Sequence, residues 1–191
     1  MIFPGGQEPV LKGDRIYLRY PQTADFPQWS EVRGTSKEFL SPWEPTWASD
    51  ELTRAAFRRR LRRYDSEIRN DTSYPFLVFR NGDNALVGGC TLSNVRRGVC
   101  QSVSLGYWIG EPFARNGYTF AAVKLLGGFV FETLGLHRLE AACIPDNLPS
   151  KMLLHKLGFR EEGLARGYLQ IGGEWRDHIL FALLKDDWPV G

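Results

Sequence analysis

The sequence predicts an α/β (α+β) domain in which helices flank a mixed, mostly antiparallel sheet of about seven strands. Two observations lead to this prediction. Residues 74–109 alternate strand-like runs with turn residues, as an antiparallel meander does, and from residue 117 helical periodicity alternates with further strand-like runs. A length of 191 residues is typical of one compact unit, so we expect a single domain over residues 1–191.

The first elements are short. Polar and apolar residues alternate over residues 15–20, which predicts a half-buried strand, and Thr23 is expected to cap a helix that ends near Arg33. Residues 39–47 contain Pro42 and Pro45, which block helix and strand ladder alike, so we expect an irregular, aromatic-rich loop. Such a loop is either a packed connection or the wall of a binding site, and the sequence leaves both open.

An arginine-rich helix is predicted next, from Ser49 or Asp50 to about Asn70. One narrow stripe along it is apolar and consists of Phe57, Leu61, Tyr64 and Ile68. The opposite half carries five arginines, namely Arg58, Arg59, Arg60, Arg62 and Arg63. They form either a solvated face or a patch that binds RNA phosphates or an acidic partner.

The remaining elements follow from turn residues and periodicity. Strands are predicted at residues 74–80, 85–95 and 101–109, separated by turns at 81–84 and 96–98. A helix at 117–134, a strand at 137–143 and a helix at 147–157 ended by Gly158 come next. The last two strands, 165–171 and 174–183, are expected to join at Gly172-Gly173 as a hairpin.

Composition excludes several classes of protein. With 13% aromatic residues the chain is not disordered, and its longest apolar runs, 125–131 and 179–184, are far shorter than the ~20 residues of a membrane helix. Residues 1–6 show no basic segment before an apolar block, so no signal peptide is expected and the chain is interpreted as cytoplasmic. A net charge of +2 is too small to indicate nucleic-acid binding.

Cysteine and histidine spacing argues against metal binding. Cys90, Cys100 and Cys143 form no CxxC pair, and no two histidines stand four residues apart. We therefore expect reduced thiols, no disulfide and no metal site.

The most informative stretch is residues 105–119. A strand enters a short loop with a glycine, Gly117, and a helix begins at once. The first backbone N–H groups of a helix are unpaired and lie at the positive end of its dipole, so they suit an anion such as a diphosphate. Gly117 would let the backbone approach that ligand closely.

Together with residues 134–140, Asn147, Ser150 and Leu157-Gly158-Phe159, this loop resembles the GNAT acyl-CoA N-acyltransferases. The resemblance is to the RimJ/RimL type, which acetylates protein N-termini, and it runs from residue 11 to residue 188. It implies a GNAT-like fold and acetyl-CoA as the cofactor. The residues it implies for cofactor binding are Trp108, Ile109, Gly110, Arg115, Asn116, Gly117, Tyr118, Thr119, Asn147 and Ser150.

The loop departs from the family pattern, Gln/Arg-x-x-Gly-x-Gly/Ala, at two positions. Ala114 stands at the first position and Thr119 at the last, while Gly117 is retained. Backbone amides would still bind the pyrophosphate, with Arg115 as a charge partner.

The resemblance also implies catalytic roles. Acetyl transfer from a thioester to an amine needs an oxyanion donor, here the backbone of residues 108–110, and a proton for the leaving thiolate. Leu154 stands where many relatives have a tyrosine acid, so Ser150 is the expected donor, with Tyr168 as the alternative. Glu140 is the candidate base, unless it pairs with an arginine such as Arg138.

The implied function is acetylation of a protein N-terminus of the ribosomal-protein-alanine type, by direct attack in a ternary complex. Two alternatives stay open. One is acetylation of a small amine such as an antibiotic, polyamine or amino acid; the other is a catalytically weak acyl-CoA-binding module on the ribosome. A ribosome contact would use Arg58, Arg59, Arg62 and Arg63. The sequence leaves the acceptor open, as well as the choice between monomer and homodimer.

Overall fold

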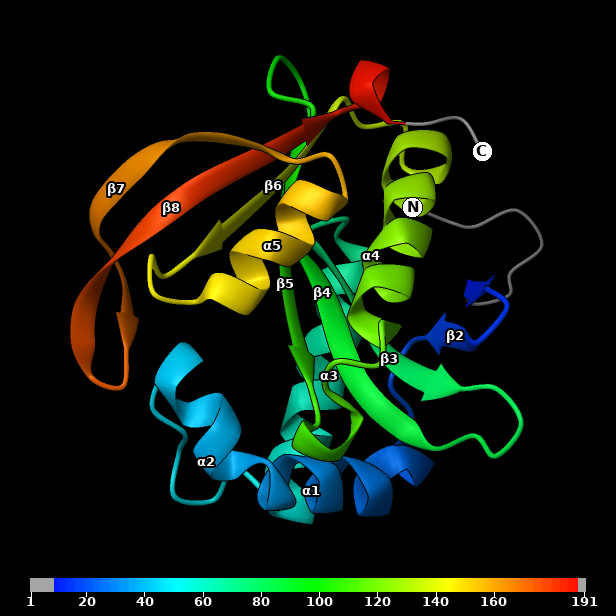
Figure 1. Ribbon diagram of the computed structural model, residues 1–191. Coiled ribbons are helices and arrows are strands. Elements are labelled where there is room, and N and C mark those ends of the chain that lie inside the picture. Colours follow the sequence, from blue (N-terminus) through cyan, green and yellow to red (C-terminus); the bar gives the residue numbers. More distant parts are fainter. Residues whose placement is uncertain (1–8, 189–191) are drawn as a thin grey trace.

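The computed structural model describes residues 9–188 (Figure 1). The strands of these residues form one eight-stranded sheet in the order β1-β2-β3-β4-β5-β6-β8-β7. Their bounds are β1 Val10–Lys12, β2 Ile16–Arg19, β3 Ser73–Arg80, β4 Leu86–Arg96, β5 Ser102–Ile109, β6 Arg138–Cys143, β7 Arg160–Ile171 and β8 Glu174–Leu184. Neighbouring strands are antiparallel except β5 and β6. The predicted sheet is confirmed, with β1 as an additional strand too short to show a period.

The helices are α1 Phe26–Thr35, α2 Lys37–Leu40, α3 Arg54–Arg69, α4 Tyr118–Gly128 and α5 Leu148–Lys156. The prediction placed the start of α3 too early, because Thr53 is the residue that caps it: its hydroxyl accepts the N–H of Ala56. Helix α4 is followed by a π-helical turn, Phe129–Thr133.

The prediction that residues 39–47 hold no regular element is wrong for their first half. Helix α2 runs into a 3₁₀ turn, Ser41–Trp43, with Pro42 inside it. A proline is tolerated there because the first N–H groups of a helical turn have no partner within it. The rest of the segment is irregular, as expected.

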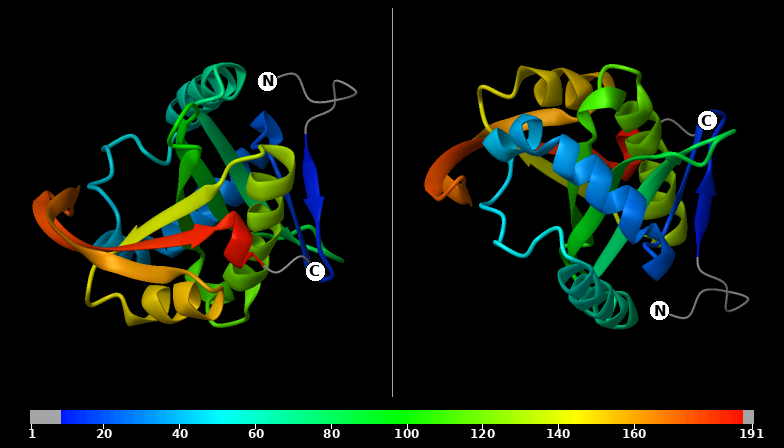
Figure 2. Two further views of the ribbon diagram at one scale, coloured as in Figure 1. Left: turned by 90° about the horizontal axis from the view of Figure 1, so that it is seen from above. Right: turned by 90° about the horizontal axis from the view of Figure 1, so that it is seen from below.

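The sheet separates two hydrophobic clusters. The larger packs Val123 and Leu126 of α4 and Leu154 of α5 against strand residues such as Leu139. The smaller, on the other face, contains Trp29 of α1 and Phe57 of α3 with side chains of β3. Figure 2 shows α3 and α5 on opposite sides of the sheet. Burial of the apolar stripe of α3 is confirmed at Phe57, which is 1% exposed.

The parallel strands β5 and β6 separate part-way along their length. They pair from Ser102↔Arg138 to Leu105↔Ala141, and β5 then continues to Ile109 paired only with β4. The splayed end is therefore residues 106–109. The register of β5 against β4 is regular over this stretch.

The β7–β8 hairpin curves away from the rest of the sheet (Figure 1). Its tip returns to the loop after α2, where the N–H of Gly172 donates to the carbonyl oxygen of Glu44 at 3.2 Å. This contact joins the C-terminal hairpin to the aromatic-rich loop.

The classes of protein considered from composition and from cysteine spacing can be compared with the structure of residues 9–188. None of the helices in residues 9–188 is long and apolar enough to cross a membrane. In the same residues no three His, Cys, Asp or Glu side chains are grouped so as to hold a metal ion. The three cysteines are free thiols, with Cys90 and Cys143 buried and Cys100 exposed. The segment considered for a signal peptide lies outside the described residues.

Candidate active site

The glycine loop presents uncapped amides at the start of α4. Gly117 precedes the helix in the left-handed conformation, with φ of 78°, and has no side chain to cap it. The first backbone bond of the helix runs from the N–H of Ala121 to the carbonyl oxygen of Gly117. The N–H groups of Tyr118, Thr119 and Phe120 therefore point out of the helix end, next to the exposed Arg115. This arrangement suits an anion.

Arg15 of the loop before β2 holds this glycine loop in place. Its guanidinium donates to the carbonyl oxygen of Asn116 at 3.0 Å and lies 5.0 Å from the centre of the Tyr118 ring. The side chain of Asn116 is used within the loop, where it donates to the carbonyl oxygens of Phe113 and Ala114. Arg15 adds a positive charge that the sequence did not indicate.

The splayed end of β5 exposes backbone donors. The N–H of Gly110 donates to Val87 of β4 at 2.8 Å. Because N–H groups alternate in direction along a strand, that of Trp108 also faces β4, whereas those of Tyr107 and Ile109 face the side that β6 has left. Among residues 108–110, Ile109 is thus the one whose N–H faces the gap between β5 and β6.

Ser150 lies in the first turn of α5, beside that opening. Its N–H donates to the Oδ1 of Asn147, which caps the helix, at 3.1 Å. Its Oγ is 2.6 Å from the phenol oxygen of Tyr107. Burial raises the pKa of Tyr107, more than the hydrogen bond with Ser150 lowers it. Burial likewise raises the pKa of the neighbouring Cys143 thiol.

Tyr107 was not among the predicted site residues. Strand alternation is the signal that reveals it, since Tyr107 shares a face of β5 with the buried Leu105 and so points toward α5.

A cavity of about 480 Å³ reaches β5 between α1, α3 and the aromatic-rich loop. Gly106, Tyr107 and Trp108 are the residues of β5 that line it. Its other walls include Trp29, Arg33, Glu44, Pro45, Thr46, Trp47, Glu51, Arg60, Arg63 and Tyr64. The aromatic-rich loop therefore lines a cavity, which favours the second of the two alternatives, the wall of a binding site.

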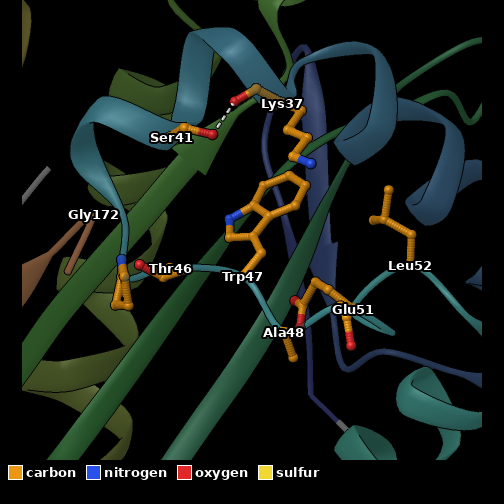
Figure 3. Close-up of a pocket in the computed structure, with 10 residues that line it drawn as sticks. Lys37, Ser41, Thr46, Trp47, Ala48, Glu51, Leu52 and Gly172 are labelled. Carbon is orange, nitrogen blue, oxygen red and sulfur yellow. Dashed lines mark hydrogen bonds between the residues drawn. The ribbon is translucent and has the colours of Figure 1, made fainter.

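Residues 45–47 and Glu51 also line a second cavity of about 380 Å³. Figure 3 shows the indole of Trp47 rising from the loop toward Lys37, with Thr46 beside Gly172 of the β7–β8 hairpin. Trp47 thus contributes to the walls of both cavities.

A buried ion pair fixes this wall. Both terminal nitrogens of Arg33 donate to the carboxylate of Glu44, each at 2.7 Å, and the indole N–H of Trp47 donates to the same carboxylate at 2.7 Å. The Arg33 guanidinium also lies 4.3 Å from the ring of Trp47 and 5.0 Å from that of Trp108. One carboxylate therefore orders a cation and the two indoles that face it.

Glu140 and Ser150 lie on opposite faces of the sheet. Leu139 and Ala141 are buried in the cluster under α4 and α5, so Glu140 projects from the other face. Its carboxylate accepts hydrogen bonds from Arg96 and Arg138. The ion-pairing alternative for Glu140 is thus what the structure shows, and both of its oxygens are engaged.

Tyr168 is not brought together with Ser150. It is 46% exposed on β7, where the register with β8 is irregular, and its ring packs edge-on against His178. Neither cavity is lined by it.

The arginines of α3 divide into two groups. Arg60 and Arg63 line the larger cavity, and Arg60 pairs with Glu51. Arg58, Arg59 and Arg62 are exposed, and Arg59 pairs with Asp50.

Comparison with known proteins confirms the resemblance. The family model described as Acetyltransferase (GNAT) domain matches residues 15–160. A probable N-acetyltransferase of Bacillus subtilis (strain 168) is 33% identical over 178 residues, which cover 93% of this chain and 98% of that protein. The ribosomal protein uS5-alanine N-acetyltransferase of Escherichia coli (strain K12) is 32% identical over 181 residues, covering 95% of this chain and 93% of that protein.

The solved structures agree. Mycobacterium smegmatis RimJ, in complex with CoA-disulfide, matches this fold with a TM-score of 0.87 at 32% identity, covering 95% of this chain and 87% of that one. The residues matched by the family model include both the start of α4 and the splayed end of β5, and the fold match covers them as well. The chain belongs to the GNAT acetyltransferase family.

Proposed function

We propose that the protein transfers acetyl from acetyl-CoA to the N-terminal α-amine of a protein, with ribosomal proteins as the substrate class. Membership of the GNAT family supports acetyl transfer. The substrate class is supported by two relatives of at least 28% identity that are named for the alanine of a ribosomal protein. Acetyl-CoA supplies the acetyl group as a thioester.

The geometry supports an assignment of the cofactor residues. The pyrophosphate lies on the amides of Arg115 to Thr119, in the loop that Arg15 holds. Trp108, Ile109 and Gly110 border the acetyl end, and the side-chain amide nitrogen of Asn147, which the helix cap does not use, is available to the pantetheine arm. The exposed loop and the uncapped helix end fit a diphosphate.

In the chemical step, the N–H of Ile109 stabilises the oxyanion that forms when the amine attacks. The hydroxyl of Ser150 gives a proton to the leaving sulfur. Glu140 is not given the role of base, because two arginines engage its carboxylate. The amine loses its proton to solvent in the cavity.

The observation that carries the proposal is the larger cavity. It meets the splayed strand at residues 106–108, on the face of the sheet opposite α5. Amine and thioester would thus meet from opposite sides, as direct transfer requires.

Thiol release from acetyl-CoA tests the proposal. The amines to compare are peptides with a free alanine N-terminus, the same peptides blocked at the N-terminus but carrying lysine, and small amines such as polyamines and amino acids. We expect turnover on the free N-terminus alone, and Ser150→Ala should lower it by about 10²–10⁴-fold. Turnover on small amines only, or binding of acetyl-CoA without turnover on any amine, would contradict the proposal.

A further inference from the structure

The hydrogen bond between Tyr107 and Ser150 has a preferred direction. A phenol is a stronger acid than an aliphatic alcohol, so Tyr107 is the better donor and the oxygen of Ser150 the better acceptor, over their 2.6 Å separation. In that arrangement the hydroxyl hydrogen of Ser150 is not used by Tyr107 and can be donated to another acceptor. The Ser150 backbone is itself fixed by the cap from Asn147.

Tyr107 also connects the two sides of the sheet. It lines the larger cavity together with Gly106 and Trp108, while its hydroxyl contacts α5. Within residues 9–188, Ser150 lines neither cavity. Of this pair, Tyr107 is thus the residue that borders the cavity, while its hydroxyl lies on the face of the sheet that carries α5.

We propose that Tyr107 is a positioning residue for acetyl transfer, which directs the hydroxyl of Ser150 toward the sulfur and replaces the proton that Ser150 gives up. This inference rests on the function proposed above. The nitrogen–carbon bond forms and the carbon–sulfur bond breaks, with the electron pair leaving on sulfur. Ser150 protonates the sulfur, Tyr107 protonates Ser150, and solvent returns to Tyr107 the proton lost by the amine. The net result is one proton moved from nitrogen to sulfur.

Burial is consistent with this role. The raised pKa of Tyr107 disfavours a lasting tyrosinate, so the phenol is protonated at the start of each cycle. Within residues 9–188, the hydroxyl of Tyr107 forms its hydrogen bond with Ser150, which is not ionic. The thiols of Cys90 and Cys143 are the other titratable groups that affect it.

Tyr107→Phe removes one oxygen and keeps the ring. With any amine that the wild type acetylates, we expect kcat to fall by about 10–100-fold while the KM for acetyl-CoA stays within about twofold. Tyr107→Phe combined with Ser150→Ala should be no slower than Ser150→Ala alone, because the two residues act in one chain. Tyr17→Phe is the matched control: its hydroxyl bonds to Asn84 of a distant turn, so its kcat should be that of the wild type.

A second readout needs no acceptor amine. The ultraviolet absorbance of the thiolate gives the pKa of the thiol of bound CoA, and this pKa should rise by about 0.5–1 unit in Tyr107→Phe because Ser150 becomes a weaker donor to sulfur. If no amine is acetylated, the proposed function fails, and this titration still decides the role of Tyr107.

An unchanged thiol pKa together with an unchanged kcat would overturn the inference, as would a rise in the KM for acetyl-CoA at constant kcat. If Tyr107→Phe does not fold, 3-fluorotyrosine at position 107 serves instead. Its hydroxyl is retained but more acidic, so the pH profile of kcat should shift to lower pH. A purely structural hydrogen bond would leave that profile in place.

Discussion

Glu44→Ala is the change that most directly tests how the acceptor wall is built. It removes the carboxylate that accepts three hydrogen bonds from Arg33 and Trp47, each at 2.7 Å. The Arg33 side chain is only 7% exposed, so its charge would stay buried without a partner. Breaking a buried pair in this way costs about 3–5 kcal/mol, and the 20% exposure of Glu44 places the expected loss near the lower end, about 3 kcal/mol.

For a chain of this size, about 3 kcal/mol corresponds to a fall in Tm of roughly 6–12 °C, measurable by calorimetry or circular dichroism. Because Trp47 would lose its anchor, the KM for the acceptor should rise. The affinity for acetyl-CoA should not change, since the glycine loop and Ser150 share no contact with Glu44. Glu44→Gln should be intermediate, because it keeps an oxygen for the Trp47 N–H but loses the charge.

Glu38→Ala is the matched control. It removes the same charge from an exposed position of α2, where the expected change is within about 0.5 kcal/mol. Equal Tm values for Glu44→Ala and Glu38→Ala would refute the reasoning about the wall, as would an unchanged acceptor KM.

Three further predictions concern other parts of the molecule. Gly117→Val should weaken acetyl-CoA binding by at least about tenfold in isothermal titration, because a β-branched residue is strained at φ of 78° and stands over the amides; normal binding would show that the phosphate loop is misassigned. Asp71→Asn should cost stability near neutral pH. Burial raises the pKa of Asp71, but hydrogen bonds from Arg97 and Tyr74 outweigh it, so the net pKa in the folded protein is lowered. The ionised Asp71 therefore stabilises the fold above the pKa of the unfolded chain, and this stabilisation disappears as the pH falls through the pKa of the folded protein. Urea unfolding should therefore separate variant and wild type at pH 7, and the gap should shrink as the pH falls below the unfolded pKa of about 4; a constant gap would contradict this. Lastly, glutamine at the three arginines of α3 that line neither cavity, Arg58, Arg59 and Arg62, should leave turnover on a short peptide unchanged and weaken turnover on ribosomal particles. The loss should shrink as salt rises, and equal activity on particles at low salt would indicate that these arginines form only a solvated face.

Much of the fold could be predicted because its signals are local. Alternation and turn residues located the meander from β3 to β5, and the apolar stripe located α3. What failed was also local: β1 has three residues, too few for a period, and the 3₁₀ turn at Ser41–Trp43 places a proline where a helical turn tolerates it.

The site was harder to predict, because its contacts join residues far apart in the sequence. Tyr107 and Ser150 are 43 positions apart, and Arg15 and Asn116 are 101 apart. The pairing of Glu140 with Arg96 depends on which face of β6 carries the side chain, and on the hairpin that brings Arg96 beside it. Motif spacing identifies Ser150 and the glycine loop, but only the packed sheet shows which side chains surround them.

We propose that the acceptor of the acetyl group is the N-terminal amine of a ribosomal protein. Mass spectrometry of protein N-termini in cells lacking this chain tests it most directly. We expect at least one ribosomal protein to lose its N-terminal acetyl group, and the wild-type gene to restore the group while Ser150→Ala does not. Identical acetylation of all ribosomal N-termini with and without the protein would contradict the claim.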